Sequence, residues 1–428
     1  MSMQLVNGSR VVIVGGGPAG SFAALHLLRL AAEVQLDLEV TILEPRDFNQ
    51  PGSSGCNKCA GILSSTLVHN LDSLGLYLPP DLIQAQVNAY ILHLTRTELT
   101  IRQPDAAHRI LSIYRGSGPR LGKPPFPRSF DGWLLDQAQA RGANLRRTRA
   151  RAIQPGVRPV VVTAQESLEA DLVILATGVN SGRSSLDTAW RYRSPRTETM
   201  QQDEFLRPDD LQDDSVHIYF DHPPGLIFGA LIPKGDYINV SLLGRRMPAD
   251  AIERFLAENG LMSGLPGGPI SLCGCKPRVT TSSALGYYAD RLVVVGDAGI
   301  TRLYKDGIGA AFMTAKAASQ TVIQRGLSRR DFAAGFHPIC QRLALDNFYG
   351  RILFRLWTIT RRLPFLLQAW QQAILDEASR PPEDHVHTRV LWGMFTGDES
   401  YRRLFWLSLS QPALRDLWFG ALKARRHG

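Results

Sequence analysis

Three glycines near the N-terminus have the spacing of a nucleotide-binding turn. Gly15, Gly17 and Gly20 form the pattern G-x-G-x-x-G, which follows an apolar run at 11–14 and precedes a segment with helical spacing at 21–34. In this context the first glycine permits a tight turn, the second lets the backbone approach a pyrophosphate, and the third lets helix and strand pack closely. The free N–H groups at the start of the helix favour an anion. The pattern predicts that a dinucleotide binds here.

An acidic residue follows this turn at the distance that ribose recognition requires. The next apolar run, 38–43, ends on Glu44, which lies 24 residues after Gly20. A carboxylate at this position accepts hydrogen bonds from both ribose hydroxyls and repels a 2′-phosphate. Together with Pro18 and Ala19 of the turn, Glu44 is predicted to bind the ribose and pyrophosphate of the nucleotide.

A second glycine-rich segment indicates which nucleotide this is. It follows an apolar run at 291–295 and contains Gly296, Asp297, Gly307, Ile308 and Gly309. FAD needs such a segment because its ribityl chain and isoalloxazine extend beyond the first phosphate site. Asp297 would accept hydroxyls of the ribityl chain, while Gly307 and Gly309 would bring N–H groups to the flavin pyrimidine edge, where a positive helix end stabilises the reduced flavin. The two segments together predict FAD as the cofactor.

These motifs, and the order in which they follow one another along the chain, resemble those of the geranylgeranyl reductase family. This family is a branch of the p-hydroxybenzoate hydroxylase-like flavoproteins. The similarity spans about residues 10–325. Arg128-Ser-Phe-Asp131 resembles the family's R-x-x-F-D-x-x-L segment, whose arginine contacts the cofactor, with one residue fewer between Arg128 and the phenylalanine. The segment 171–178, which ends on Gly178, resembles the strand that returns to the nucleotide domain. The resemblance implies FAD contacts from Arg128 and Gly178.

Other matches concern the substrate side of the predicted site. Lys58-Cys59-Ala-Gly-Ile resembles the family segment beside the flavin, and 225–239 resembles a strand pair of the substrate domain. Tyr304 stands where the family has a proline, at the substrate side of the flavin. Cys59 and Tyr304 are therefore the candidates for a catalytic proton donor. Thr177 replaces an aspartate that the hydroxylase branch links to pyridine-nucleotide use, so the electron donor is expected to be either NAD(P)H or a ferredoxin-like protein.

These motifs require an α/β scaffold. The resemblance implies a Rossmann-like FAD-binding domain of the p-hydroxybenzoate hydroxylase type, with an inserted mixed α+β substrate domain and a C-terminal helical region. We expect a discontinuous FAD-binding domain at 8–70, 110–185 and 280–325, a substrate-binding domain at 71–109 and 186–279, and a helical domain at 326–428. Alternating apolar residues predict strands of the substrate domain within 87–102, 217–220 and 227–243.

The C-terminal region, 327–428, differs in composition from the rest of the chain. It holds five of the seven tryptophans, and from Thr321 onward there are 16 basic against 9 acidic side chains. A helix predicted at 348–373, broken by Pro364, places arginines among large apolar residues. Such helices suit a membrane surface. We favour the other interpretation, a helical cap that covers the flavin domain and has an ordinary basic surface.

Cysteine and histidine give weaker signals. Cys56 and Cys59 form a C-x-x-C pair, and Cys273 and Cys275 form a C-x-C pair. A metal site and a redox dithiol are both open, but we favour Cys59 packed beside the isoalloxazine and expect no metal, because C-x-C is a poor chelate. We expect Cys340 to be a buried apolar residue. His385 and His387 are expected in a polar surface loop.

The net charge of +9 and the pI of about 9.5 would also fit nucleic-acid binding. The basic residues are mixed with large apolar ones, however, which favours a membrane surface over nucleic acid. No stretch reaches the roughly 18 uninterrupted apolar residues of a spanning helix. No secretory signal is predicted. We therefore expect a cytoplasmic protein, either free or attached peripherally to a membrane.

The sequence thus predicts an FAD-dependent oxidoreductase. The reaction that the resemblance implies is hydride transfer from reduced flavin to an apolar, polyprenyl-like substrate, at a carbon–carbon double bond. Two alternatives stay open: a flavin-dependent monooxygenase or halogenase on the same scaffold, and a membrane-docked flavoprotein that carries electrons. The predicted partners are the apolar small molecule, a redox carrier protein and a membrane surface.

Overall fold

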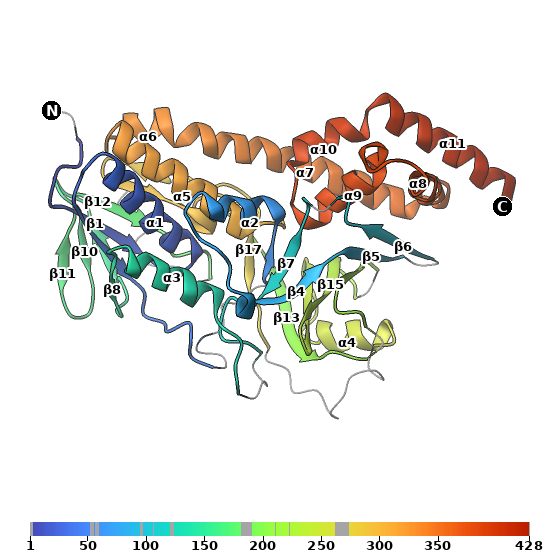
Figure 1. Ribbon diagram of the computed structural model, residues 1–428, viewed down its shortest axis with the longest axis horizontal. Helices are drawn as coiled ribbons and strands as arrows, with labels where there is room; N and C mark the ends of the chain where they lie inside the picture. The colour runs from blue at the N-terminus through green and yellow to red at the C-terminus, as the bar shows by residue number, and fades with distance from the viewer. Residues whose placement is uncertain are drawn as a thin grey trace.

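A computed structural model provides the fold (Figure 1). It describes residues 3–51, 55, 60–94, 97–105, 107–119, 124–180, 191–209, 211–221, 223–261 and 274–427. Cys56, Cys59 and Cys273, on which the predicted cysteine pairs depend, lie outside these residues.

A six-stranded sheet is the centre of the first half of the molecule. Its order is β18 (Tyr288–Ala289), β19 (Leu292–Val294), β12 (Leu172–Leu175), β1 (Ser9–Val14), β2 (Leu38–Leu43) and β8 (Asn144–Arg146). Five of these strands are parallel, and only β18 at the edge is antiparallel. The strands come from three separate stretches of the chain, so distant segments must meet before the sheet is complete.

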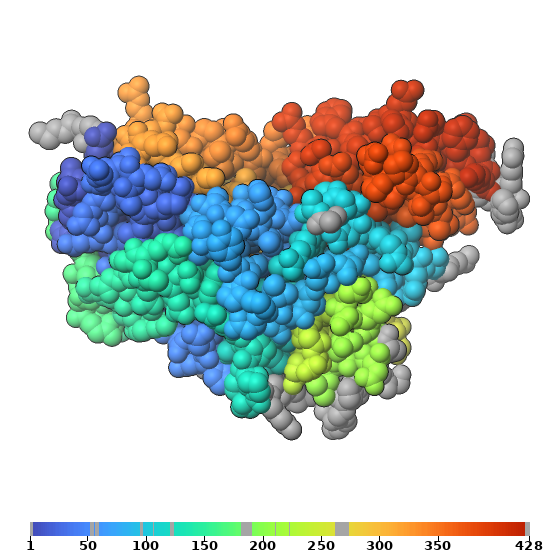
Figure 2. All heavy atoms as spheres, viewed as in Figure 1, coloured from blue at the N-terminus to red at the C-terminus, as the bar shows by residue number. Residues whose placement is uncertain are grey.

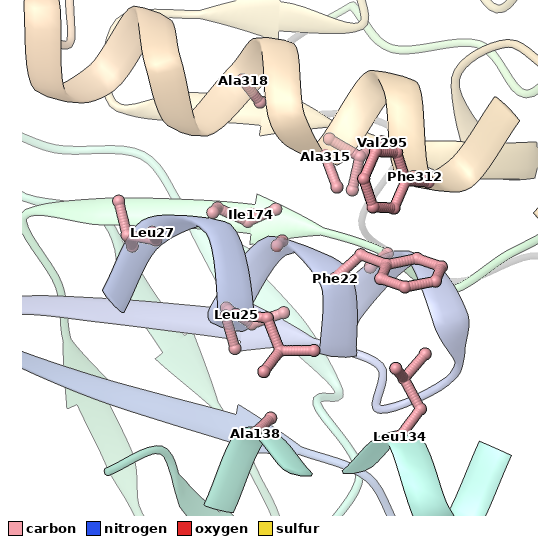
Figure 3. Close-up of a cluster of buried hydrophobic side chains, with 14 of the residues drawn as sticks. Phe22, Leu25, Leu27, Leu134, Ala138, Ile174, Val295, Phe312, Ala315 and Ala318 are labelled. Atoms are coloured by element: carbon pink, nitrogen blue, oxygen red, sulfur yellow. The ribbon is translucent and has the colours of Figure 1, made fainter. Parts of the chain in front are cut away.

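Both faces of this sheet are covered, which explains its continuous apolar strands. Val11 and Ile13 of β1 face α1 (Pro18–Glu33), α3 (Phe130–Ala140) and α5 (Gly307–Gln324). Val12 and Val14 face the other way, toward a three-stranded sheet of β9 (Ala152–Gln154), β10 (Val160–Val162) and β11 (Ser167–Glu169). Figure 3 shows α1 between α3 and α5, with Phe22 opposite Phe312. Their ring centroids lie 5.1 Å apart.

A seven-stranded sheet forms the second half. Its order is β17 (Arg278–Thr280), β13 (Thr197–Leu206), β16 (Tyr237–Gly244), β15 (Leu226–Lys234), β14 (Ser215–Tyr219), β5 (Ala89–Leu94) and β6 (Thr97–Arg102). The strands predicted within 87–102, 217–220 and 227–243 are thereby confirmed. Leu231 faces α4 (Ala251–Glu258), whereas its neighbours Ala230 and Ile232 face the C-terminal helices.

Smaller elements connect the two halves. A three-stranded sheet has the order β3 (Ile62–Leu63), β7 (Ile110–Ile113) and β4 (Ile83–Val87). Helix α2 (Ser65–Asp72) and a short 3₁₀ helix, η2 (Pro80–Leu82), lie in the same part of the chain, and another, η4 (Gly296–Ala298), follows β19. Lys234 at the end of β15 joins the parts, because its buried Nζ donates to the main-chain oxygen of Ile113 at 2.7 Å.

The remainder of the chain is helical, as expected. The helices are α6 (Arg329–Gly335), α7 (His337–Arg362), α8 (Pro364–Glu377), η5 (Pro382–Asp384), α9 (Val386–Thr396), α10 (Tyr401–Ser408) and α11 (Gln411–His427). The predicted break at Pro364 is confirmed, since α7 ends at Arg362 and α8 begins at Pro364. Within the described residues, no helix combines the length and apolar character that crossing a bilayer requires. The predicted α/β class with a C-terminal helical region is therefore confirmed.

The C-terminal helices cover only part of the expected flavin domain. Helix α6 and the first turns of α7 pack against the first half through Phe332, Phe336 and Cys340, and loop 301–306 also contacts α7. From Leu353 onward the helices pack against the seven-stranded sheet, and Trp392 lies edge-on to Tyr90 of β5 at 5.5 Å. The apolar outer face of that sheet determines this placement. Figure 2 shows these helices, in orange and red, along one edge of the molecule.

Of two predictions about single residues in the C-terminal region, the one for Cys340 is confirmed and the one for His387 is wrong. Cys340 is buried, as predicted, and burial raises the pKa of its thiol to about 12. The surface placement of His387 is wrong, because this residue is only 1% exposed. Glu377 explains the difference: its carboxylate accepts the N–H groups of His387 and Thr388 at 2.6 and 3.0 Å and thus caps the start of α9.

We expect Trp392→Ala to destabilise the protein by about 3–5 kcal/mol, because it leaves a cavity between α9 and the sheet. Trp406→Ala is the matched control, since Trp406 is 57% exposed and should cost less than about 0.5 kcal/mol. Urea unfolding measures both variants. Equal effects of the two substitutions would contradict the packing described.

Candidate functional site

The first helix begins as an open anion site. Gly17 is the N-cap of α1 and Pro18 follows as the first helical residue, and within the described chain no side chain caps this turn. A Cβ at Gly17 would approach only Arg115 and Asp131, at 3.8 and 3.9 Å. The first-turn N–H groups and the positive end of the helix dipole therefore face space next to an arginine, which suits a pyrophosphate.

The other glycines of the turn are required by close contacts. Gly15 has φ of +107°, and a Cβ there would lie 2.6 Å from the main-chain oxygen of Ala176. A Cβ at Gly20 would lie 1.8 Å from the main-chain oxygen of Gly15. Gly16, which the motif leaves variable, is also restricted, because a Cβ there would lie 2.7 Å from the Cβ of Glu44. Helix, turn and strand thus fit only with these glycines.

Glu44 is fixed at the end of β2 beside the turn. Its carboxylate is buried, accepts the N–H of Gly16 at 3.0 Å through Oε2, and accepts the N–H of Arg46 at 3.0 Å through Oε1. A cavity of about 540 Å³ follows directly, lined by Pro45, Arg46, Asp47, Gln50 and Arg147. A carboxylate beside such a cavity, one residue before Pro45 of its lining, is placed to bind the hydroxyls of a nucleoside.

The second glycine segment packs directly on the first. Gly296 has φ of +63°, and a Cβ there would lie 2.6 Å from the Cβ of Ala19 on α1. Asp297 follows, and burial raises the pKa of its carboxyl, while the Thr301 hydroxyl and Arg115 oppose that rise. The two predicted cofactor segments, separated by about 280 residues of sequence, therefore form one continuous surface.

The start of α5 is capped by its own sequence. Asp306 is the N-cap, and its Oδ1 accepts the N–H of Gly309 at 3.2 Å. A Cβ at Gly309 would lie 2.4 Å from this carboxylate, so the cap explains the glycine. Gly307 and Ile308 form the first turn of α5. This end of the helix faces Asp297 and Thr301, because the Cβ position of Gly307 is 3.6 Å from Asp297 Oδ1.

A buried arginine fixes the loop before α5. Arg302 donates to Asp306 Oδ2 at 3.1 Å, to the main-chain oxygen of Glu399 at 2.5 Å and to that of Gly397. Its guanidinium also lies 3.7 Å from Asp346 of α7. Loop 301–306 is thus tied to the C-terminal helices as well as to α5.

Arg115 is a site residue that the sequence analysis missed. Its guanidinium binds the buried carboxylate of Asp131 in two places, Nε to Oδ1 at 2.9 Å and Nη2 to Oδ2 at 2.5 Å. Arg128, for which a cofactor contact was predicted, is 41% exposed, and its Nη1 lies 3.7 Å from Asp81. Arg115, next to Gly17, is therefore the arginine that faces the turn. Nothing in its local sequence indicates this, because Asp131 becomes its partner only through folding.

Lys305, within the second glycine-rich segment, is another site residue that the sequence analysis missed. Its Nζ lies 4.5 Å from the ring centroid of Phe228 on β15 and 5.9 Å from that of Phe395 on α9. No carboxylate of the described residues forms an ion pair with it. Burial alone lowers the pKa of this amine to about 7. At neutral pH it therefore exchanges protons readily.

The side chain of Tyr304 is directed toward Glu198. Its hydroxyl donates to Glu198 Oε2 at 3.1 Å, and Arg245 pairs with the same carboxylate. Burial and Glu198 raise the pKa of Tyr304 to about 12. Its ring packs 5.3 Å from that of Phe354 on α7. As a proton donor at neutral pH, Tyr304 is therefore weaker than Lys305.

The remaining predicted residues are placed as follows. Gly178 has φ of +64° and turns the chain after β12, and its neighbour Thr177 lies against Gly15. Cys59 lies outside the described residues, so its predicted place beside the flavin stays a prediction. Cys275 is half-buried.

No family model matches this chain, and no curated protein matches it significantly. Solved structures do match. A geranylgeranyl bacteriochlorophyll reductase-like protein from Thermoplasma acidophilum has a TM-score of 0.65 at 17% identity, covering 96% of this chain and 100% of that one. A 2-methyl-3-hydroxypyridine-5-carboxylic acid oxygenase has a TM-score of 0.57 at 16% identity, over 83% and 93% of the two chains. The myxobacterial chondrochloren halogenase, described as FAD-dependent, has a TM-score of 0.55 at 17% identity, over 77% and 78%. The predicted fold is thereby confirmed.

The contrast between two glycines tests the pyrophosphate site. Alanine fits at Gly17, so Gly17→Ala should cost less than about 1 kcal/mol of stability but weaken FAD binding about tenfold or more, because its methyl group occupies the anion's space. Gly20→Ala should instead lower the stability of the fold itself. Thermal melts of the flavin-free protein and fluorescence titration with FAD separate the two effects. Unchanged FAD affinity in Gly17→Ala would contradict this site.

Proposed function

We propose that this protein is an FAD-dependent oxidoreductase that reduces carbon–carbon double bonds of an isoprenoid or other apolar substrate. The observation that carries the proposal is the direct packing of Gly296 on Ala19. This contact places the open N-terminus of α1 beside the carboxylate of Asp297 and the N-terminal end of α5. An extended dinucleotide with two binding ends suits such a surface, and the solved structures of the same fold include FAD-dependent and reductase-like proteins.

The residues present fit FAD. The α1 N-terminus and Arg115 would hold the pyrophosphate, and Glu44 with the adjoining cavity would hold the adenosine. Asp297 would accept ribityl hydroxyls, and the N-terminal end of α5 at Gly307 and Ile308 would face the isoalloxazine. When bound, FAD would supply the hydride for reduction of the substrate.

The chain itself would supply the proton and the apolar surroundings. Phe228, Phe354 and Phe395 come from three different elements and surround the side chains of Tyr304 and Lys305. These rings would exclude water and accept a hydrocarbon substrate. Lys305 would hold a proton at Nζ for the second carbon of the double bond, and Tyr304 would position its neighbours through Glu198.

The electron donor would be either NAD(P)H or a ferredoxin-like protein. Thr177, two residues after β12, replaces the aspartate that the resembled hydroxylases link to pyridine-nucleotide use, which supports the second donor. The excess of positive charge would suit an acidic carrier protein. A cytoplasmic location, with peripheral attachment to a membrane, would be consistent with both donors.

The alternative function is a monooxygenase or halogenase. It is favoured by the oxygenase and the halogenase that share the fold at TM-scores of 0.57 and 0.55. An electron-carrying flavoprotein without a substrate is the third candidate. These functions differ in what reoxidises the reduced protein.

The decisive experiment reduces the flavin-loaded protein without oxygen and then adds either a polyprenyl substrate or air. Reoxidation by the polyprenyl compound without oxygen, with a product heavier by one H₂, would support the reductase. Rapid reoxidation by air, with oxygen or halogen in the product, would favour the alternative. Failure of the protein to bind FAD under any condition would overturn the proposal as a whole.

Lys305 gives a pH-dependent prediction. A proton donor must be protonated, so the rate of anaerobic reduction should fall as pH rises through about 7, the pKa of Lys305. Lys305→Met should be about a hundredfold slower and lack this dependence. Tyr304→Phe is the control and should retain it.

An independent measurement is the titration of methylated lysines by ¹³C NMR, since the chain has only seven lysines. The signal missing from Lys305→Met should titrate near pH 7. A signal that titrates at the ordinary lysine value would show that this amine remains charged and is no proton donor at neutral pH.

A further inference from the structure

Exposed apolar side chains are concentrated in the C-terminal helices. Of the 21 large apolar side chains that are exposed among the described residues, 13 lie between positions 345 and 422. They are Leu345, Phe348, Leu356, Ile359, Leu363, Phe365, Leu375, Trp406, Leu409, Leu414, Trp418, Phe419 and Leu422. Scattered exposed apolar residues are ordinary, but such a concentration in one region indicates an interaction surface.

Helix α7 has two opposite apolar sides. Leu343, Leu353 and Trp357 belong to its buried side. The exposed residues at 345, 348, 356, 359 and 363 fall together on the other side, because 3.6 residues make one turn. The arginines at 351, 355 and 362 border this outer stripe and are also exposed. An amphipathic helix of a globular protein would have a polar outer side, so this helix has an unsatisfied apolar face.

Helix α11 repeats the arrangement. Leu414, Trp418 and Leu422 recur every four residues and are 51%, 65% and 41% exposed. On the opposite side, Gly420 packs against α8, where a Cβ would lie 2.6 Å from the main-chain oxygen of Ala369. Arg415 stands beside the exposed stripe, with 59% of its side chain exposed.

The charge on the outside of these helices is strongly positive. Between 337 and 427 there are eight carboxylates, and five of them are buried: Asp346, Glu377, Asp398, Glu399 and Asp416. Only Glu383 and Asp384 are fully exposed, against eight exposed basic side chains, namely Arg342, Arg351, Arg355, Arg362, Arg402, Arg403, Arg415 and Lys423. Three of these basic side chains, Arg403, Arg415 and Lys423, form ion pairs with carboxylates at 2.7–3.2 Å. The other five still give the surface an excess of positive charge.

We propose that the outer faces of α7 and α11 bind the surface of an anionic lipid bilayer. Tryptophan, phenylalanine and leucine would enter the boundary between headgroups and acyl chains, while the bordering arginines would bind lipid phosphates. A second copy of this chain fits less well, because two such surfaces would bring like charges together. The charge pattern therefore favours lipid.

The surface lies close to the candidate active site. Asn347 of α7 binds loop 301–306 on its inner side, where its amide donates to the main-chain oxygen of Thr301 and accepts the N–H of Leu303. Phe354 of the same helix contacts Tyr304. Since a helix with its side chains is about 10 Å across, the bilayer would lie about one helix diameter from this loop. Binding itself needs no cofactor, so it can be tested apart from the proposed function.

The first test is sedimentation with vesicles. The wild type should bind vesicles of phosphatidylcholine mixed with phosphatidylglycerol about tenfold or more tightly than vesicles of phosphatidylcholine alone. Raising NaCl from about 0.05 to 0.5 M should weaken the electrostatic part of this binding. Quenching of tryptophan fluorescence by brominated lipid should show that an exposed tryptophan enters the bilayer. Equal binding to neutral and anionic vesicles, or no binding, would overturn the proposal.

Two double variants locate the surface: Phe348→Ser with Ile359→Ser on α7, and Trp418→Ser with Phe419→Ser on α11. All four residues are more than half exposed, so thermal melts should stay near the wild type while vesicle affinity falls about tenfold. Tyr77→Ser with Val157→Ser is the matched control outside the region, at 76% and 92% exposure, and should bind normally. Unchanged vesicle binding by both double variants would overturn the assignment. Concentration-dependent dimers in light scattering, lost in these variants without any vesicle binding, would assign the surface to a second copy instead.

Discussion

The geometry of the candidate site depends on one buried guanidinium. Arg302 has acceptors on α5, on the turn between α9 and α10, and near α7, and it is only 8% exposed. An unpaired charge at this depth would cost several kcal/mol, so the segments that carry its acceptors must stay together. Loop 301–306 is fixed in this way, and with it Tyr304 and Lys305. The C-terminal helices are therefore part of the site.

The features that follow from local spacing could be predicted from the sequence. Gly15 and Gly20 are placed as expected, because close contacts in the turn between strand and helix leave no room for a side chain there, whereas Gly17 borders open space. Glu44 likewise stands at the end of its strand, beside the turn. The strands of the substrate half were visible as alternating apolar residues, since one side of each faces α4 or the C-terminal helices. Alternation of apolar residues indicates a strand with one buried side, whichever helix covers that side.

The features that depend on distant partners could not be predicted. Arg115 gains its role from Asp131, and the depressed pKa of Lys305 arises from burial, which only the folded chain produces. His387 is buried because Glu377 of the preceding helix caps α9. The contact of the later C-terminal helices with the seven-stranded sheet was not predicted for the same reason: an amphipathic pattern shows that a face is buried, but not against which sheet.

The strand order of the first sheet has a consequence for biosynthesis. β1 lies between β2 and β12, and β12 in turn pairs with β19, so Val11 is joined to Leu172 and Val173 to Leu292. Helix α5, which completes the core over this sheet, ends only at Gln324. Non-local pairing of this kind is slow, and the early apolar segments stay exposed while they wait. More than three-quarters of the chain must therefore be synthesised before the core over this sheet is complete, and until then its apolar segments are open to aggregation.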